Sequence, residues 1–172
     1  SFNHIIKEGQ GDLSVEDSLN VTTFDLNAGR TVFNEDTSAE TLTLSPGVFL
    51  EVQGGKTLST QNLNGSGTCS NYIHVKSKTS GVPATISQPS GEVALNFAHI
   101  TDTIVSGGAT FVANQSFDHG GNIGWGFSPI TPQDYYWVGG GGNWTDGSHW
   151  SLESGGGGSG CGPTYLDNVF FD

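Results

Sequence analysis

Short runs in which apolar and polar residues alternate recur along the first three quarters of the chain. They are rich in β-branched and aromatic residues and are bounded by Gly, Pro, Asn and Ser, which is typical of strands separated by turns. The clearest runs are Val21–Leu26, Thr41–Leu44, Val48–Val52, Tyr72–Lys76, Ala84–Ser87, Val93–Phe97 and Ala109–Ala113. No segment carries an i, i+3, i+4, i+7 apolar stripe of helical length. The pattern therefore predicts an all-β protein.

The arrangement of these runs favours a parallel β-helix. A hairpin-built sandwich would show two-residue Asn-Gly or Asp-Gly turns between the strands, and such turns are nearly absent between the runs. The runs instead recur at intervals of about ten residues, as in coils that must stack to bury their apolar faces. We therefore expect a right-handed parallel β-helix or solenoid-like module. A β-sandwich is the alternative, because short alternating strands are also its signature.

The composition changes after Phe127. A segment with two prolines follows and has the character of a linker, and beyond it the chain becomes rich in glycine and aromatic residues. Three tryptophans are spaced to converge as a small aromatic cluster: Trp137, Trp144 and Trp150. The expected organisation is a body at 1–127, a linker at 128–134 and a Gly/Trp-rich segment at 135–172.

The charge balance excludes several classes of partner. The 172 residues carry 17 acidic side chains against five Lys and Arg, a net charge of −12. Such a chain offers no basic face to nucleic acid or to anionic lipid, so we expect neither as a partner. Few charges and 27 glycines leave a surface of Ser, Thr, Asn and Gln, which is typical of secreted bacterial proteins. The chain contains no methionine, which indicates a processed product or a piece of a longer protein.

The two cysteines, Cys69 and Cys161, fit neither a redox CxxC motif nor a zinc site. A single disulfide formed in an oxidising compartment is the simplest interpretation, and two unrelated thiols are the alternative. We therefore expect a secreted or cell-surface location.

Residues 137–150, WVGGGGNWTDGSHW, followed by residues 161–172, CGPTYLDNVFFD, carry a specific pattern of three Trp and a Pro-Asp-Val spacing. This pattern resembles the opening of repeat modules in giant secreted surface proteins and adhesins of gliding, type IX-secreting bacteria. The phrase NIGWGF at 122–127 is similar to the end of such modules. The resemblance implies that 135–172 begins a module that the next copy completes.

A repeat of this kind would assemble head-to-tail with neighbouring copies of itself. The register implied by the resemblance joins Asp172 of one copy to Ser1 of the next, either in a tandem array or between subunits that lend their C-terminal part. The expected inter-repeat or capping aromatics are Trp137, Trp144, Trp150, Phe170 and Phe171. In this arrangement the Cys69–Cys161 bond could join neighbouring copies, and a bond within one chain would count against it.

We expect no enzymatic activity. Glycosidases need two carboxylates facing across a cleft, and the acidic residues here are scattered, with adjacent pairs only at apparent turns. No GxSxG, Walker or HExxH motif occurs, and the five histidines show no metal-ligand spacing. No cofactor is expected. Calcium at a loop site with Asp146 or Asp167 is the remaining metal candidate. The resemblance to the surface-protein modules implies instead that Asp167 caps a turn before the last strand.

Two surface features could serve recognition. Trp144 and Trp150, if exposed, could form a platform for a surface polysaccharide, whereas packing on the Gly-rich loop would make them a solenoid cap. Ser18 and Thr103 lie in Asp-Ser/Thr-apolar triplets similar to O-glycosylation acceptors of such bacteria.

The first functional hypothesis is a structural or adhesive repeat of an extracellular bacterial filament or giant surface protein. The alternative is a carbohydrate-binding or polysaccharide-degrading β-helix domain.

Overall fold

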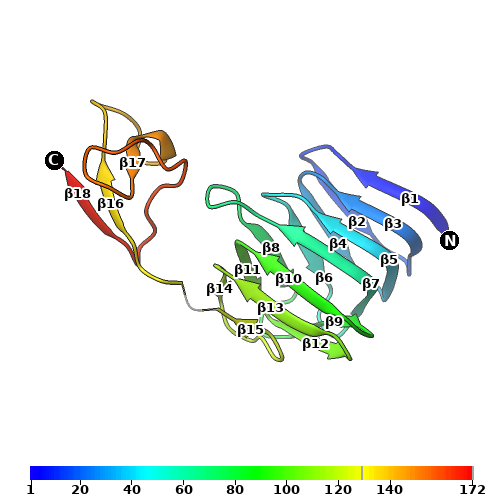
Figure 1. The fold of residues 1–172 in the computed structure, drawn as a ribbon. Helices are drawn as coiled ribbons and strands as arrows, with labels where there is room; N and C mark the ends of the chain where they lie inside the picture. Colours follow the sequence, from blue (N-terminus) through cyan, green and yellow to red (C-terminus); the bar gives the residue numbers. More distant parts are fainter. Residues whose placement is uncertain (129, 172) are drawn as a thin grey trace. The chain divides into compact units, whose positions relative to one another are not determined.

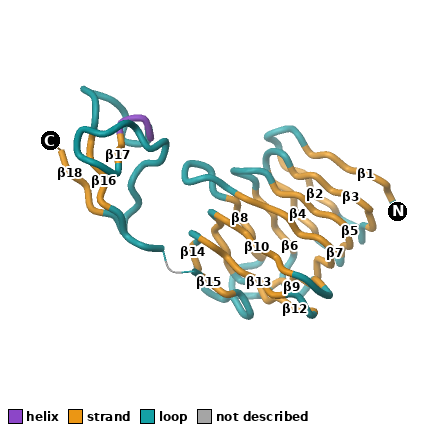
Figure 2. Tube along the Cα trace, viewed as in Figure 1, coloured by secondary structure: helices purple, strands orange, loops and turns teal. Residues whose placement is uncertain are grey.

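The computed structural model describes residues 1–128 and 130–171, with 52% of the chain in strands. The chain divides into two compact units, Ser1–Pro129 and Ile130–Asp172, here called the body and the C-terminal unit. The division falls inside the linker predicted at 128–134. The prediction of an all-β protein is confirmed (Figure 2).

The body contains two parallel sheets. Sheet A runs in the order β1-β3-β5-β7-β10-β13-β15, with β9 and β12 branching from β7, and sheet B in the order β14-β11-β8-β6-β4-β2 (Figure 1). Sheet A comprises β1 Phe2–Lys7, β3 Asn20–Leu26, β5 Thr37–Leu44, β7 Thr57–Ser66, β9 Ala84–Gln88, β10 Glu92–Asn96, β12 Thr103–Gly107, β13 Thr110–Asn114 and β15 Gly126–Phe127. Sheet B comprises β2 Asp12–Val15, β4 Arg30–Phe33, β6 Phe49–Val52, β8 Ile73–Ser77, β11 Ala98–Thr101 and β14 Phe117–Asp118.

The chain alternates between the two sheets as far as β8, and after that two successive strands of sheet A, first β9 and β10 and then β12 and β13, precede each strand of sheet B. One passage through both sheets is here called a coil. Each strand lies parallel to the strand of the same sheet in the next coil, as in the pairings of β1 with β3 and of β2 with β4. Side chains that hydrogen-bond between coils are typically 18 to 28 residues apart in sequence. All pairings between named strands within 1–128 are parallel, so this part of the chain lacks the antiparallel hairpins that the sandwich alternative requires.

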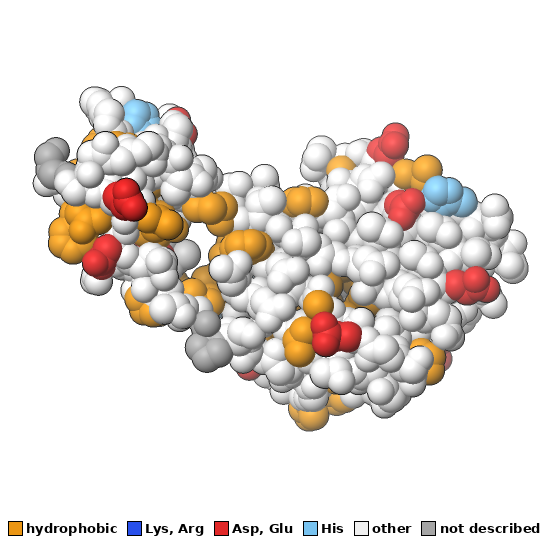
Figure 3. Space-filling view, in the orientation of Figure 1, with side chains coloured by type: hydrophobic (Ala, Val, Ile, Leu, Met, Phe, Trp, Pro, Cys, Tyr) orange, Lys and Arg blue, Asp and Glu red, His pale blue; other side chains and the backbone are white. Residues whose placement is uncertain are grey.

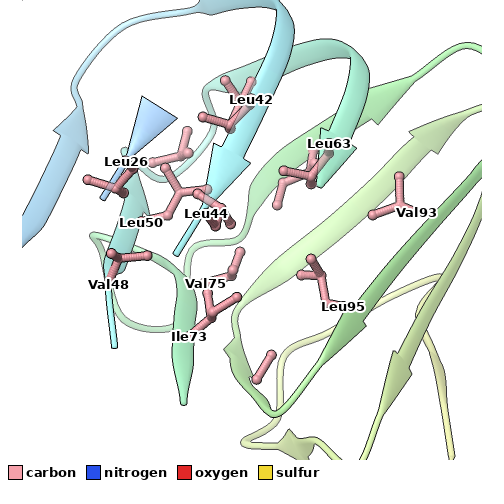
Figure 4. Packing of buried hydrophobic residues seen from close by; sticks show 14 of the residues in the cluster. Leu26, Leu42, Leu44, Val48, Leu50, Leu63, Ile73, Val75, Val93 and Leu95 are labelled. Atoms are coloured by element: carbon pink, nitrogen blue, oxygen red, sulfur yellow. The ribbon is translucent and has the colours of Figure 1, made fainter. Parts of the chain in front are cut away.

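The core lies between the sheets and is built of side chains stacked in columns. In sheet A, Leu26 is in register with Leu44 on the next coil, and Leu44 with Gly65. A Cβ at Gly65 would lie 3.1 Å from side-chain atoms of Leu44, Ile73 and Leu95. The absence of a side chain at position 65 therefore leaves room for these three residues. Figure 4 shows these side chains converging between the strands. Because the core is shared, each coil buries its apolar side chains against the coils on either side of it.

One inward-facing column of sheet B contains a buried polar residue among its aliphatic side chains. It runs in register through Leu13, Thr31, Leu50, Val75 and Ile100. Thr31 is 0% exposed, and its Oγ1 has no hydrogen-bond partner within the described residues. A hydroxyl is thus buried against hydrocarbon in an otherwise apolar column.

The C-terminal unit is a small three-stranded sheet with the order β17-β16-β18. Strand β16 (Asp134–Trp137) pairs antiparallel with β17 (Trp150–Ser151) and parallel with β18 (Asn168–Phe171). A single 3-10 turn, η1 (Gly147–His149), precedes β17 and is capped by the Asp146 carboxylate, which accepts from the Ser148 N–H at 3.0 Å. The expected final strand is therefore present as β18.

Candidate functional site

The outer face of sheet B carries a column of aromatic and charged side chains, one from each strand. Strand register aligns them in the order Asp12, Arg30, Phe49, His74, His99 and Phe117. Successive strands of a sheet lie about 4.8 Å apart, which is close to the stacking distance of aromatic rings. Stacked coils therefore bring these residues together although they are far apart in the sequence. We call this column the sheet B ladder.

The rings of the sheet B ladder form a continuous stack. The centroid distance is 4.1 Å from Phe49 to His74 and 4.8 Å from His74 to His99, with ring planes within 13° of parallel. Phe117 continues the stack at 5.0 Å from His99. His119 lies beside the stack. Its Nε2 and the Nδ1 of His99 are 2.6 Å apart and share a hydrogen bond. Inside the stack the ring faces are occupied by neighbouring rings.

The imidazoles of the ladder are uncharged at neutral pH. Burial, together with the nearby His74 and His119, lowers the pKa of His99 to about 4. The pKa of His74 is also lowered, first by burial and then by the charge of Lys76 and the neighbouring His119. A stack of neutral rings avoids the repulsion that adjacent imidazolium ions would create.

A charged cluster borders the ladder. The Glu51 side chain is 4% exposed and accepts hydrogen bonds from Arg30 Nη2 at 2.5 Å and from Lys76 Nζ at 3.2 Å. Arg30 Nη1 donates to Asp12 at 3.0 Å. Burial raises the pKa of Glu51, but the bonds from Arg30 and Lys76 outweigh it and hold the pKa below its ordinary value. The bonds to Glu51 and Asp12 also raise the pKa of Arg30. The cluster holds Arg30 in one orientation.

A recess of about 260 Å³ lies at the end of the aromatic stack. It is lined by Gln10, Asp12, Gly29, Arg30, Gly47 and Phe49. Phe49 is 37% exposed, and the ring of His74 covers one of its faces. Since Phe49 lies between His74 and Arg30 in the ladder, its other face is directed towards Arg30 and the recess. The recess thus combines an aromatic face, a guanidinium, a carboxylate and an amide.

The predicted convergence of the three tryptophans is confirmed in the C-terminal unit. Trp150 is 0% exposed, with ring centroids 5.0 Å from Trp137 and 4.6 Å from Trp144. Its Nε1–H donates to the Trp144 carbonyl at 2.8 Å. The prediction that Trp144 and Trp150 form an exposed platform is therefore wrong for Trp150, because that ring is at the centre of the unit's core. Trp144 remains 50% exposed.

Strand β18 carries the other predicted aromatics on the edge of the small sheet. All four of its residues are exposed, with Phe170 at 43% and Phe171 at 68%. Phe170 stacks on Tyr136 at 5.0 Å, and Phe171 lies 6.1 Å from the ring of Trp137. Apolar side chains gather on the surface of this unit in Figure 3, whereas the visible face of the body is mostly polar. The edge strand is therefore apolar and accessible.

The prediction that the two cysteines form a disulfide is confirmed. Both Cys69 and Cys161 are disulfide-bonded, and no cysteine is free. A bond that joins neighbouring copies stays a prediction.

The two glycosylation candidates lie in opposite environments. Ser18 is exposed beside a polar recess that it helps to line. Thr103 is 1% exposed, and its hydroxyl contacts Asn122 Oδ1 and Trp125 Nε1, each at 3.0 Å. A glycosyltransferase cannot reach this hydroxyl in the folded body. The prediction that Thr103 accepts an O-linked glycan is therefore wrong for the folded protein.

The two calcium candidates both serve as turn caps. The Asp167 carboxylate accepts the N–H groups of Gln133 at 2.8 Å and Thr164 at 2.6 Å, and Asp146 caps the 3-10 turn. The cap expected at Asp167 is therefore present. Within 1–128 and 130–171, no group of three or more His, Cys, Asp or Glu side chains could hold a metal ion. The same residues include no helix long and apolar enough to cross a membrane.

The chain matches no model of a known protein family. Comparison with curated proteins and with solved structures likewise finds no significant match.

Proposed function

We propose that this chain is a structural and adhesive repeat of an extracellular bacterial filament or giant surface protein, without catalytic activity, whose partners are neighbouring copies of itself. The stacked coils form a right-handed parallel β-helix in this proposal, because crossovers between parallel strands are almost always right-handed. The paired cysteines fit an oxidising extracellular compartment.

The observation that carries the proposal is the exposed apolar edge of β18. An edge strand presents unpaired N–H and C=O groups, and proteins normally protect such edges with charges, prolines or covering loops. In β18, Val169, Phe170 and Phe171 are 37%, 43% and 68% exposed. A strand of this composition is suited to accept a strand from another copy.

The first coil of the body offers the complementary surface. Phe2 of β1 is in register with Val21, which is 1% exposed and belongs to the core. Phe2 itself is 59% exposed, since no coil of the described chain lies on its other side. Stacked repeats need a cap or a neighbour at such an end to keep the core from water. We assign this role to the C-terminal unit of the adjacent copy.

The charged groups around the recess beside Phe49 support a non-catalytic role for the chain. Asp12 is bound to Arg30, and Glu51 is buried between Arg30 and Lys76. These carboxylates act as structural partners of cations, whereas a glycosidase needs one carboxyl group free to donate a proton.

Hydrogen exchange on one copy and on two copies joined in tandem tests the assembly. We expect the amides of β1 in the second copy to exchange at least tenfold more slowly than those of β1 in the single chain. Phe171→Lys in the first copy should abolish this protection, because it places a charge on the pairing edge. Leu152→Lys is the matched control, since Leu152 is 51% exposed in the same unit but lies outside β18.

Equal exchange of β1 in the single chain and in the tandem chain would overturn the proposal. Equal effects of Phe171→Lys and Leu152→Lys would show that β18 is not the contacting edge.

A further inference from the structure

The recess beside Phe49 combines the groups that recognise a sugar ring. We propose that it binds one neutral hexose residue of a glycan. The inference names the ligand of the adhesive surface and therefore rests on the function proposed above. It draws on residues of the body, whereas the β18 edge belongs to the C-terminal unit.

The aromatic part of the recess is the face of Phe49 that lies away from His74. The opposite face is covered by His74 at 4.1 Å, with the two ring planes within 5° of parallel. The stack fixes the ring, so that a ligand does not have to order it on binding. The negative π face attracts groups with partial positive charge, and the C–H groups on one side of a hexose are of this kind. Phe49 is the one ring of the stack that borders the recess.

The polar part of the recess offers both donors and acceptors to sugar hydroxyls. Arg30 has five N–H donors, of which two are used by its bonds to Asp12 and Glu51 within the described chain. The Asp12 side chain is 63% exposed and accepts, while the Gln10 amide can donate and accept. Because Glu51 and Asp12 hold the guanidinium in place, its remaining donors have a fixed direction.

Charge and size select a single neutral ring. Asp12 and Glu51 compensate the charge of Arg30, and the chain as a whole carries −12, so a carboxylated or sulfated sugar would find no unpaired cation. The volume of about 260 Å³ lies just below the range of about 300–1,000 Å³ that is typical of sites for drug-sized ligands. Gly29 and Gly47 add no side chains to the recess. A Cβ at Gly29, where φ is +73°, would lie 2.7 Å from the Gly9 carbonyl oxygen.

The polar recess near Ser18 on sheet A provides a comparison. It is lined by Ser18, Leu19, Asn20, Asp36, Thr37, Ser38 and Ser59, a set with neither an aromatic ring nor a cation. The combination of a fixed aromatic face with an oriented guanidinium distinguishes the recess at Phe49 from it.

Saturation-transfer difference NMR on the full oxidised chain tests the proposal. The probes are the methyl glycosides of glucose, galactose and mannose, with methyl glucuronide as the acidic comparison. We expect saturation transfer to at least one neutral glycoside. Phe49→Ala should weaken its binding about tenfold, which corresponds to about 1.4 kcal/mol and lies within the range of an aromatic contact. Gln10→Ala should weaken it by a smaller factor.

Phe117→Ala is the matched control, because Phe117 stacks in the same ladder but does not line the recess. It should leave binding unchanged, and circular dichroism verifies that each variant is folded. The proposal is overturned if no neutral glycoside binds, if the glucuronide alone binds, or if both Phe variants weaken binding equally. Protection of β1 in the tandem chain reports assembly separately, so loss of either property can be recognised without the other.

Discussion

Replacing Thr31 by valine should stabilise the body. Thr31 is fully buried in a column of Leu and other aliphatic residues, and its hydroxyl has no partner among the described residues. Valine has nearly the same shape and an equally high preference for strands, so the Thr31→Val change removes the hydroxyl without creating a cavity. The sign of the effect follows from the lost desolvation penalty.

The size of this effect can be worked from the environment. A buried polar group without a hydrogen bond costs about 1–3 kcal/mol in protein mutational data. We therefore expect Thr31→Val to raise the free energy of unfolding by about 1–2 kcal/mol. For a chain of this length, about 1 kcal/mol shifts the melting temperature by about 2–4 °C. The expected rise in melting temperature is therefore about 2–8 °C.

Thr60→Val is the matched control, because Thr60 is equally buried but satisfied. Its Oγ1 lies 3.3 Å from Gln88 Oε1 and 3.4 Å from the Ser87 carbonyl, and Thr60 is 2% exposed. Removing this hydroxyl should lower stability by about 1 kcal/mol. Differential scanning calorimetry of the two variants and the parent at pH 7 measures both changes.

The opposite signs make the reasoning refutable. If Thr31→Val and Thr60→Val shift the melting temperature in the same direction, hydrogen bonding does not distinguish the two sites. If Thr31→Val lowers stability, the hydroxyl at position 31 has a partner that stabilises the fold.

Three further perturbations have defined outcomes. Because the folded pKa of His99 is about 4 and that of His74 is also lowered, the unfolded chain takes up these protons first, so the contribution of the two imidazoles to stability should fall between about pH 6.5 and 4. Below that range, protonation of Glu51, whose pKa is also lowered, should reduce stability further. For the two imidazoles we expect a loss of about 1–2 kcal/mol after allowance for solvent screening, measured by urea titration, and His99→Phe should remove most of it. Trp150→Ala should cost about 3–5 kcal/mol and abolish the near-ultraviolet dichroism of the C-terminal unit without unfolding the body. On a non-reducing gel, bonds between copies through Cys69 and Cys161 should give a ladder that collapses with thiol, whereas a monomer band under both conditions would show pairing within one chain.

Alternation of apolar and polar residues was sufficient to predict most of the fold. The run Val21–Leu26 falls within β3, and Thr41–Leu44 is the end of β5, because a strand with one buried face requires this pattern. The absence of hairpin turns indicated that neighbouring strands come from successive coils. The exact pairing was not predictable, since coils of unequal length leave no fixed period in the sequence.

No comparable signal along the chain points to the sheet B ladder. His74, His99 and His119 looked scattered, and they meet only because strand register aligns β8, β11 and β14. The recess was missed for the same reason, since Arg30 and Phe49 belong to different coils. The Trp cluster could be foreseen because its members lie within one short segment. Thr103 was misjudged because an acceptor triplet contains no information on burial.

The stacking of coils also determines how the body would respond to a pulling force. The backbone hydrogen bonds between strands run along the stack, so tension on its two ends would load the bonds of one terminal coil before those of the next. A coil of 18 residues adds about 4.8 Å to the stack but about 60 Å to the chain once it is peeled away and extended. A tether made of such coils would lengthen stepwise under flow and dissipate work at each step, while the coils that remain keep their core.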